Sequence, residues 1–340
     1  MKNFELEERR CLVLGASGVL GINLCNALVA CGATVTAYGR TLSPRGSLHQ
    51  DVEWISGLFD DVRTLRHAVR GQEFVFHLIS ATIPEDSNRD PAADLAANVL
   101  STVRLLEVCC EEGVKKVVFS SSGGTVYGIP SQVPIPESSP TEPISGYGIS
   151  KLAIEKYLAL FHRLYGLEYH ICRISNIYGP FQRGNRRQGL VATTIRRALL
   201  QERVEIWGDG QVIRDFVYVD DVVAAMLYGC FYHGSYRVMN VGSGIGLTVN
   251  QVVHDIELVL NEGAIERLHH PGRTVDVPRN ILDISLIQSE TPWRPMVNWH
   301  EGLRRSIKWM RAGSIASNLN TARDSCKQSQ DVPQLKNWTL

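Results

Sequence analysis

Two short patterns in this chain contain residues whose types and spacing suit chemistry. The first is GASGVLG at 15–21, between a short apolar run and a helical pattern. Gly15 permits a tight turn, Gly18 lets backbone amides approach a pyrophosphate, and Gly21 lets the following helix pack closely on the strand. The N-terminus of that helix would face the phosphates with its partial positive charge. The segment, including Ser17 in the turn, predicts a dinucleotide site; a purely structural turn is the alternative.

The second pattern is the pair Tyr147 and Lys151, which would share one face of a helix because they are four residues apart. A tyrosine with a pKa of about 10 is a poor base at neutral pH. A nearby ammonium, helped by a positive nicotinamide ring, stabilises the phenolate and brings its pKa toward the working range. Such a pair is often only a surface contact. Here it follows a buried strand that ends in three serines, so it predicts an acid/base pair for redox chemistry on a hydroxyl group.

The residues after the second predicted strand bear on the choice between NAD and NADP. A carboxylate at this point accepts hydrogen bonds from the ribose hydroxyls, whereas an arginine pairs with the extra 2′-phosphate. This chain has Gly39 and Arg40 there. The local chemistry therefore favours NADP, with a solvated loop charge at Arg40 as the alternative.

Apolar runs and helical patterns alternate through the first half of the chain, which predicts a parallel sheet with helices on both faces. We expect strands at 11–14, 34–38, 53–56, 74–79, 116–120 and 169–174, and helices at 21–30, 62–69, 98–110 and 147–165. The predicted fold class is α/β, a Rossmann-type doubly wound parallel sheet with a smaller C-terminal substrate-binding region.

Three regions follow from this pattern. Residues 1–175 form mainly the dinucleotide-binding domain, and residues 176–311, where Gly, Arg and aromatic residues replace the regular alternation, form mainly the substrate-binding region. Some of this second region should return to the Rossmann sheet. Residues 312–340 are polar and lack periodicity, so we expect a loosely held tail.

The composition excludes several classes of function. The 340 residues include 35 Lys plus Arg and 35 Asp plus Glu, so neither nucleic acid nor an anionic membrane is expected as a partner. No apolar stretch is long enough for a membrane span or a signal peptide. The eight cysteines show no metal-binding spacing, which predicts no metal site. A cytoplasmic protein with reduced thiols fits these observations.

Several ordered motifs between about residues 10 and 310 resemble the extended short-chain dehydrogenase/reductase family, particularly nucleotide-sugar epimerases and dehydratases of the UDP-glucose 4-epimerase type. The matching segments are GASGVLG at 15–21, FVFHLIS at 74–80, Asn98, FSSSGGTVYG at 119–128, YGISK at 147–151, RISNIYGP at 173–180, GDGQVIRDFVYVDD at 208–221, NVGSG at 240–244 and PGRTVD at 271–276. Their order along the chain is far more specific than any one motif.

The resemblance implies roles for the catalytic residues. Tyr147 would be the acid/base, and Lys151 would bind the nicotinamide ribose and tune the tyrosine. A serine after the fourth strand would hydrogen-bond the reacting sugar oxygen. Ser122 is the preferred candidate, with Ser121 and Thr125 as neighbours that would contact the substrate.

The resemblance also implies ligands for the rest of the two molecules. Asn98 would belong to the cofactor site, and Asn176 would hold the sugar diphosphate. Arg214 and Arg273 would bind its pyrophosphate, a role that suits a planar cation with fixed donors; an ordinary salt bridge is the alternative for each arginine.

The chain departs from the family pattern at three positions. Gly39 stands where the family has an acidic residue, and Gly57-Leu58 stands where the family has a Gly-Asp pair that contacts adenine. Gly123-Gly124 replaces the Asp-Glu that the dehydratases place after the catalytic hydroxyl residue. Asn280 falls where 4-epimerases limit room for an N-acetyl group, and its intermediate size leaves the choice of sugar open.

The leading hypothesis is a nucleotide-sugar 4-epimerase for UDP-hexoses or UDP-N-acetylhexosamines, acting by transient oxidation at C4 with bound NAD or NADP. One alternative is an NADPH-dependent 4-keto-sugar-nucleotide reductase, which Gly39 and Arg40 favour. Another is a non-catalytic dinucleotide-binding relative, which the intact Tyr147 and Lys151 oppose. Related enzymes pair the helices predicted at 98–110 and 147–165 into a four-helix bundle, so we expect a homodimer.

Overall fold

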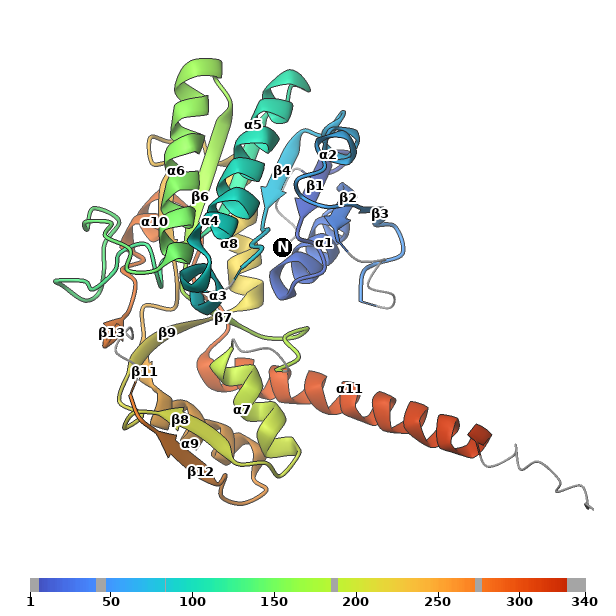
Figure 1. Cartoon of the computed structure of the whole chain (residues 1–340), viewed down its shortest axis with the longest axis vertical. Coiled ribbons are helices and arrows are strands. Elements are labelled where there is room, and N and C mark those ends of the chain that lie inside the picture. The colour runs from blue at the N-terminus through green and yellow to red at the C-terminus, as the bar shows by residue number, and fades with distance from the viewer. Residues whose placement is uncertain (1–5, 41–46, 83, 185–188, 273–276, 329–340) are drawn as a thin grey trace, which may run out of the picture.

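The computed structural model describes residues 6–40, 47–82, 84–184, 189–272 and 277–328. The chain folds into a larger upper part built on one sheet and a smaller lower part that carries α7, α9, β8 and β12 (Figure 1). Arg273, one of the two arginines expected to bind pyrophosphate, lies outside the described residues.

The larger part is organised by a seven-stranded sheet in which all neighbouring strands are parallel. In spatial order the strands are β10 (Val238–Val241), β6 (Glu168–Ile174), β5 (Lys116–Ser122), β4 (Phe74–His77), β1 (Arg10–Leu14), β2 (Thr34–Gly39) and β3 (Glu53–Ser56). The strand order reverses between β1 and β4, where open α/β sheets bind their ligands. The predicted Rossmann-type fold is confirmed.

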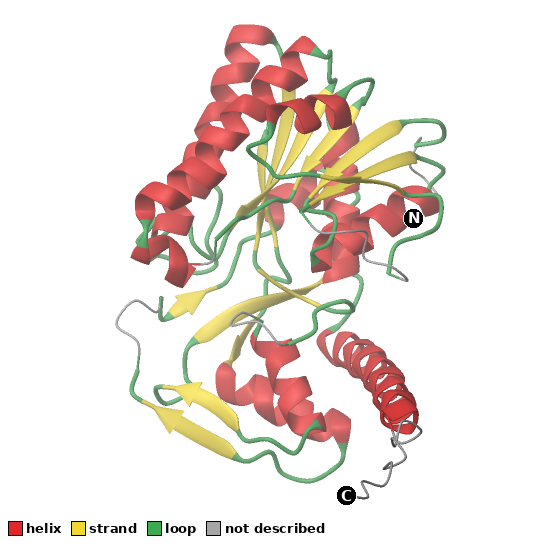
Figure 2. Cartoon of the chain, turned by 45° about the vertical axis from the view of Figure 1, so that its right-hand side comes forward, coloured by secondary structure: helices red, strands yellow, loops and turns green. Residues whose placement is uncertain are grey.

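Helices cover both faces of this sheet (Figure 2). On one face, α1 (Val19–Ala30) and α8 (Val219–Phe231) pack in one apolar cluster. On the other face, α2 (Val62–Val69), α5 (Ser101–Glu111) and α6 (Gly146–Tyr165) pack in a second cluster. The strands are apolar on both faces because each face is buried under helices.

The smaller part consists of short strands and helices from the second half of the chain. Its elements are β7 (Asn176–Tyr178), α7 (Leu190–Leu199), β8 (Val204–Trp207), β9 (Ile213–Tyr218), β11 (Gly246–Thr248), α9 (Val249–Leu260), β12 (Arg267–His270) and β13 (Arg279–Asn280). The short helix α10 (Ser285–Glu290) instead packs against β10 of the large sheet (Figure 1). Within the smaller part, β9 pairs with β7, β11 and β13, and β8 pairs with β12. Between these elements, α8 and β10 return to the large sheet and its cover.

The helix that we expected to open at Asn98 begins further upstream. The chain is helical from α3 (Pro84–Arg89) through α4 (Pro91–Asp94) and η1 (Leu95–Leu100), a π-helical turn, into α5. Asp90 caps α4 by accepting a hydrogen bond from Ala93 N at 3.0 Å, and Pro91 provides a preorganised first position. Asn98 therefore lies inside a π-helical turn, a feature that often marks functional sites.

The C-terminal segment also differs from our expectation. Where we expected no regular structure from residue 312, α11 runs from Trp299 to Gln328; the loose attachment of residues 312–340 stays a prediction. Residues 312–328 contain no proline and several strong helix formers, and extending an existing helix is far easier than nucleating a new one. Polar composition alone was a poor guide here because a helix continues without an apolar face.

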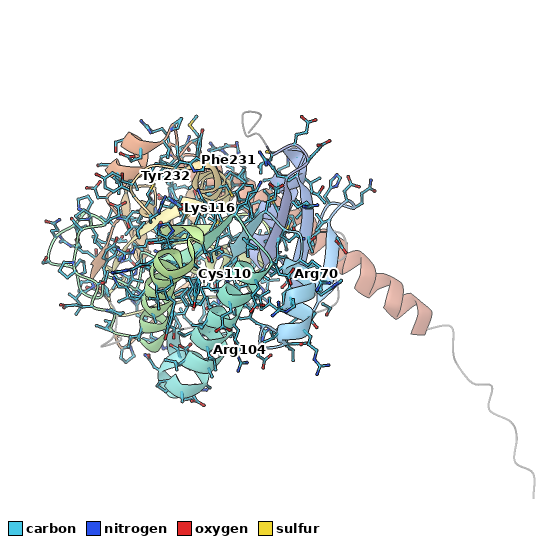
Figure 3. All side chains as sticks on the ribbon, turned by 90° about the horizontal axis from the view of Figure 1, so that it is seen from above. Arg70, Arg104, Cys110, Lys116, Phe231 and Tyr232 are labelled. Atoms are coloured by element: carbon cyan, nitrogen blue, oxygen red, sulfur yellow. The ribbon has the colours of Figure 1, made fainter. Side chains whose placement is uncertain are left out.

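A buried polar cluster lies where α8 ends against the sheet. Lys116 Nζ donates to the carbonyls of Tyr232 at 2.6 Å and Gly229 at 3.4 Å, so the ammonium satisfies carbonyls that α8 leaves open at its C-terminus. Figure 3 shows Lys116 close to Phe231 and Tyr232. The His170 ring packs edge-on against Tyr232 with centroids 5.8 Å apart.

His170 should make the stability of the fold depend on pH. Burial, with the Lys116 and Arg237 cations nearby, lowers the pKa of His170 to about 3. The ring is thus neutral in the folded state while the unfolded chain protonates below about pH 6.5. Stability is therefore lost as pH falls below that value, by about 2 kcal/mol at pH 5 from this residue.

Urea unfolding at pH 7 and pH 5 measures this effect. His170→Phe should shrink the difference between the two free energies of unfolding by about 2 kcal/mol. Replacing the exposed His233 by Gln should leave the difference unchanged. An equal pH dependence in His170→Phe and the unmodified protein would contradict the assignment.

Candidate active site

The glycine turn after β1 has the geometry of a phosphate site. Gly15 has φ +84°, and a Cβ there would lie 3.1 Å from the backbone at Leu78 and Ile79. A Cβ on Gly21 would lie 2.5 Å from Gly15 O, so only glycine lets α1 come this close. No side chain caps α1 and its first turn has no acidic residue. The first amides of α1 therefore suit a dinucleotide pyrophosphate.

Tyr147 and Lys151 lie in the first turns of α6 at the carboxyl end of β5. Ser145 caps the helix by accepting a hydrogen bond from Gly148 N at 3.2 Å, which fixes the start of α6 at Gly146, one residue before Tyr147. Lys151 Nζ donates to Ser120 O at 2.8 Å. The same ammonium is 5.7 Å from the centroid of the Tyr147 ring, so the predicted pair does share one helix face.

The environment of Tyr147 and Lys151 shifts the pKa of each group so that its neutral form is favoured. Burial raises the pKa of Tyr147 to about 12, against the opposing effect of hydrogen bonding to Ser80 and Ser122. Burial lowers the pKa of Lys151 to about 8, opposed by Glu155 and Asp94. A positive nicotinamide ring would act on this pair by favouring the phenolate.

The three serines at the end of β5 point to different sides because side chains alternate along a strand. The Ser122 hydroxyl reaches the Tyr147 phenol, as expected for the residue that meets the reacting oxygen. The Oγ1 atom of Thr125 is buried and has no hydrogen-bond partner among the described residues. The contact of both hydroxyls with a substrate beside Tyr147 stays a prediction.

Ser121 faces the other way, into a buried ionic network, and we leave it out of the substrate site. Its hydroxyl donates to Glu155 Oε1 at 2.5 Å. Arg173 Nη2 pairs with Glu155 Oε2 at 2.7 Å, and Arg173 Nη1 donates to Tyr127 Oη at 3.0 Å. Glu155 and Arg173 are 4% and 5% exposed, so the charges depend on each other for solvation.

This network should be important for stability. Glu155→Gln leaves Arg173 buried without its counter-ion, and the expected loss is about 3 kcal/mol in the free energy of unfolding. The exposed pair Glu301–Arg305 gives the matched control: Glu301→Gln should leave the free energy of unfolding nearly unchanged, because solvent screens an exposed pair. Equal losses in urea unfolding of the two variants would show that the Glu155 network does not stabilise the fold.

Asn98 holds the loop that follows β4. Its Oδ1 accepts from Ala81 N at 2.8 Å, and its Nδ2 donates to Asp94 Oδ1 at 3.0 Å and Thr82 Oγ1 at 3.1 Å. Ser150 donates to the other oxygen of Asp94 at 2.5 Å. Through these bonds Asn98 shapes the loop whose first residues lie over the glycine turn, and its predicted place at the cofactor site stays a prediction.

Sequence reasoning missed three residues of this region: Ser80, Asp94 and Ser150. Ser80 interacts with the Tyr147 phenol, and Asp94 acts on the pKa of both Tyr147 and Lys151. Ser80 could have been found, because it follows a buried parallel strand at the edge where ligands bind. Asp94 and Ser150 gave no such signal, since each looks like an ordinary helix residue until the helices are packed together.

The predicted diphosphate ligands lie on the pair β7–β9, below the large sheet. Asn176 Nδ2 donates to Asp215 O at 2.9 Å. Arg214 Nη1 donates to Val277 O at 2.6 Å and Ile213 O at 2.9 Å. Asn176 is placed beside the carboxyl edge of the sheet, and its role and that of Arg214 in binding stay predictions.

Where the sequence predicts that the adenosine half of the cofactor binds, Gly39 is buried, while Ser17 and Arg40 are exposed. Leu58 is 57% exposed and offers an apolar surface in place of a carboxylate. No group of three or more His, Cys, Asp or Glu suited to a metal occurs in the described ranges.

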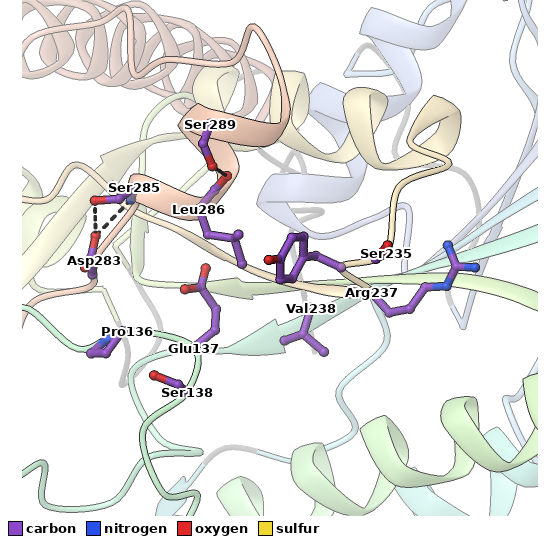
Figure 4. A pocket seen from close by; sticks show the side chains of 11 residues that line it. Pro136, Glu137, Ser138, Ser235, Arg237, Val238, Asp283, Ser285, Leu286 and Ser289 are labelled. Atoms are coloured by element: carbon purple, nitrogen blue, oxygen red, sulfur yellow. Dashed lines mark hydrogen bonds between the residues drawn. The ribbon is translucent and has the colours of Figure 1, made fainter.

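A surface pocket lies elsewhere, between the loop at 136–138, the start of β10 and α10 (Figure 4). Glu137 and Arg237 line it, and Ser285 bonds Asp283 at its rim. It contains none of the residues around Tyr147, so we do not assign the chemistry to it.

A parallel Rossmann sheet, a glycine turn and a Tyr–Lys pair on α6, the helix after β5, together define an extended short-chain dehydrogenase/reductase. The family model for the NAD dependent epimerase/dehydratase family matches residues 11–242, about two thirds of the chain. The chain belongs to this family. The resemblance predicted from its motifs is confirmed.

Relatives of known name cover nearly all of the chain. The UDP-glucose 4-epimerase of Mycolicibacterium smegmatis is 34% identical over 313 residues, which span 89% of this chain and 98% of the relative. The crystal structure of UDP-glucose 4-epimerase from Thermotoga maritima, with UDP-glucose, matches with a TM-score of 0.85 and 36% identity over 89% of this chain and 99% of the other. The Thermus thermophilus UDP-glucose 4-epimerase, in complex with NAD, matches with a TM-score of 0.83 and 31% identity over the same shares.

Proposed function

We propose that this protein is a nucleotide-sugar 4-epimerase that acts on UDP-hexoses or UDP-N-acetylhexosamines with a bound nicotinamide dinucleotide. The observation that carries the proposal is the contact of Tyr147 with Ser122 on one side and Lys151 on the other, at the sheet edge beside the glycine turn. The relatives named above support the choice of a 4-epimerase within the family.

The chain supplies the proton chemistry of this reaction. A bound nicotinamide dinucleotide would supply a reversible hydride acceptor for sugar C4. Tyr147 takes the proton of the C4 hydroxyl through its phenolic oxygen, and Ser122 orients that hydroxyl by a hydrogen bond. Lys151, held by Ser120 O, stabilises the phenolate and would bind the nicotinamide ribose. Tyr147 returns the proton to the C4 oxygen after the keto sugar has rotated.

The remaining residues hold the two ligands. The glycine turn with Ser17 binds the cofactor pyrophosphate, and Asn98 orders the loop over it. Thr125 offers its unpartnered hydroxyl to the sugar. Asn176, Arg214 and Arg273 bind the diphosphate of the substrate, which must be held firmly while the hexose turns.

A second function, 4-keto-sugar-nucleotide reduction with NADPH, is favoured by one feature: Gly39 and Arg40 in place of an acidic residue. It uses the same Tyr147 and Lys151 but releases the dinucleotide after each turnover. A non-catalytic role accords poorly with a buried Lys151 placed next to the phenol, because burying an ammonium without a use is unfavourable.

The deciding experiment incubates the purified protein with UDP-glucose, UDP-galactose and their N-acetyl forms without added dinucleotide. We expect epimerisation, because the cofactor is regenerated in each cycle. Tyr147→Phe should lower kcat at least about 100-fold while the dinucleotide content is unchanged. Turnover only with NADPH and a 4-keto sugar would replace the epimerase by the reductase, and full activity of Tyr147→Phe would remove Tyr147 from the mechanism.

The outer face of α6 supports a homodimer. Tyr157, Leu160 and Leu164 follow helical spacing and are 37%, 43% and 58% exposed, and Leu100 nearby is 46% exposed. Such a stripe on one side of a helix is typical of a surface covered by a second copy.

Sedimentation velocity tests this assembly. Leu160→Glu places a charge in the middle of the stripe and should convert the dimer to a monomer at micromolar concentration. The same change at Leu258, an exposed leucine on α9 away from the stripe, should leave the dimer intact. A monomeric unmodified protein would refute the dimer.

None of the helices among the described residues is long and apolar enough to cross a membrane. Cys11 and Cys25 are buried free thiols, and burial raises the pKa of both to about 12. These thiols behave as small buried hydrophobes. They support our proposal that the protein works in the reducing cytoplasm.

A further inference from the structure

The end of β2 is shaped by a contact between Gly39 and Trp54 on the neighbouring strand β3. A Cβ at residue 39 would lie 2.8 Å from Cη2 and 2.9 Å from Cζ2 of the Trp54 indole. Trp54 pairs with Ala37, two residues before Gly39, so all three side-chain positions lie on one face of the sheet. Even a methyl group would collide with the far edge of the indole, so Trp54 occupies the space of a side chain at position 39 and would have to move to admit a carboxylate.

This contact lies where the adenosine ribose must reach the protein. The same hypothetical Cβ would be 3.7 Å from Ser17 Oγ, in the middle of the turn that suits the pyrophosphate. An acidic residue at the end of the second strand normally accepts hydrogen bonds from the ribose hydroxyls and repels a 2′-phosphate. Here that acceptor is missing because the indole has taken its place.

The next residue adds the opposite charge. Arg40 is exposed, and it makes no hydrogen bond or ion pair within the described parts of the chain. An arginine at this point suits a phosphate dianion because its planar guanidinium offers parallel donors. The site has thus lost the group that selects against a 2′-phosphate and has a group that attracts one.

We propose that the Gly39–Trp54 contact, with Arg40 beside it, admits a 2′-phosphorylated dinucleotide, so that this protein binds NADP(H) at least as tightly as NAD(H). The inference rests on the dinucleotide site of the proposed function and is independent of which sugar reacts. It makes Trp54 a residue that determines cofactor choice through the space it occupies.

The test is a competition on the full-length protein. The protein is equilibrated by dialysis with equimolar NAD⁺ and NADP⁺, and the dinucleotides it retains are released by heat and quantified by mass spectrometry. We expect at least as much NADP⁺ as NAD⁺. Arg40→Gln, an exposed change that should not disturb folding, should lower the NADP⁺ to NAD⁺ ratio about tenfold.

A set of variants at the contact tests the role of the indole. Gly39→Asp alone should not create a preference for NAD⁺, because Trp54 leaves no room for the carboxylate. Gly39→Asp combined with Trp54→Val opens that room and should shift the ratio about tenfold or more toward NAD⁺. Trp54→Val alone should leave the ratio unchanged, and thermal unfolding confirms that each variant is folded.

The outcomes separate this inference from the proposed function. More NAD⁺ than NADP⁺ retained by the unmodified protein, or an Arg40→Gln variant with an unchanged ratio, overturns the inference and leaves the epimerase proposal intact. A conversion to NAD⁺ preference by Gly39→Asp alone also overturns it, since the indole would then exclude nothing. Retention of neither dinucleotide overturns both proposals.

Discussion

Two hydrogen bonds join consecutive residues at the end of β5 to α6. The carbonyl of Ser120 accepts from Lys151 Nζ at 2.8 Å, and the hydroxyl of Ser121 donates to Glu155 Oε1 at 2.5 Å. Lys151 and Glu155 are one helical turn apart, so the helix can neither slide along the strand nor rotate on it while both bonds hold. Tyr147, one turn before Lys151, is thereby held opposite Ser122, and the acid/base geometry follows from this attachment.

Such an attachment requires charges inside the protein, and the fold balances them. Lys151 and Arg173 are 4% and 5% exposed, while Asp94 and Glu155 are 1% and 4% exposed. Two cations and two carboxylates therefore lie on α6 or beside it. The carboxylates accept hydrogen bonds from Asn98, Ser150, Ser121 and Arg173, and Lys151 donates to the carbonyl of Ser120. An unpaired charge at this depth would be strongly destabilising, whereas a satisfied network favours one arrangement over others. The site is rigid because alternatives to it would leave a charge unpaired.

Local spacing was enough to predict some of this site and not the rest. Tyr147 and Lys151 followed from the helical period, and the glycine turn followed from its position between strand and helix. The spacing did not distinguish Ser121 from Ser122. Because β5 is buried on both faces, its apolar run does not show which side chains point to which face of the sheet. The role of Trp54 was also invisible, since its contact with Gly39 depends on which strand lies beside β2.

The position of Asn98 within a helical segment was likewise not predictable from local spacing. The sequence marked the residue but placed it at the start of a helix, whereas α3, α4 and a π-helical turn precede α5. The capping by Asp90 and Pro91 sets the start further upstream, and propagation continues the helix through residues of ordinary propensity. The same propagation extends α11 beyond residue 312, so both differences have one physical cause.

Two of the departures from the family pattern share an explanation in packing. Gly39 faces the indole of Trp54, and a Cβ on Gly123 would lie 2.6 Å from Leu282 Cδ1. In each case a large side chain from a neighbouring segment fills the space that a polar side chain would need. The space therefore stays filled, but the polar group of the family pattern is absent. Next to Leu282, Asn280 Nδ2 donates to Gly123 O at 3.1 Å and ties the substrate region to the catalytic strand. This hydrogen bond from Asn280 joins the two parts of the site, while the exchange at Gly39 removes a carboxylate from the end of β2.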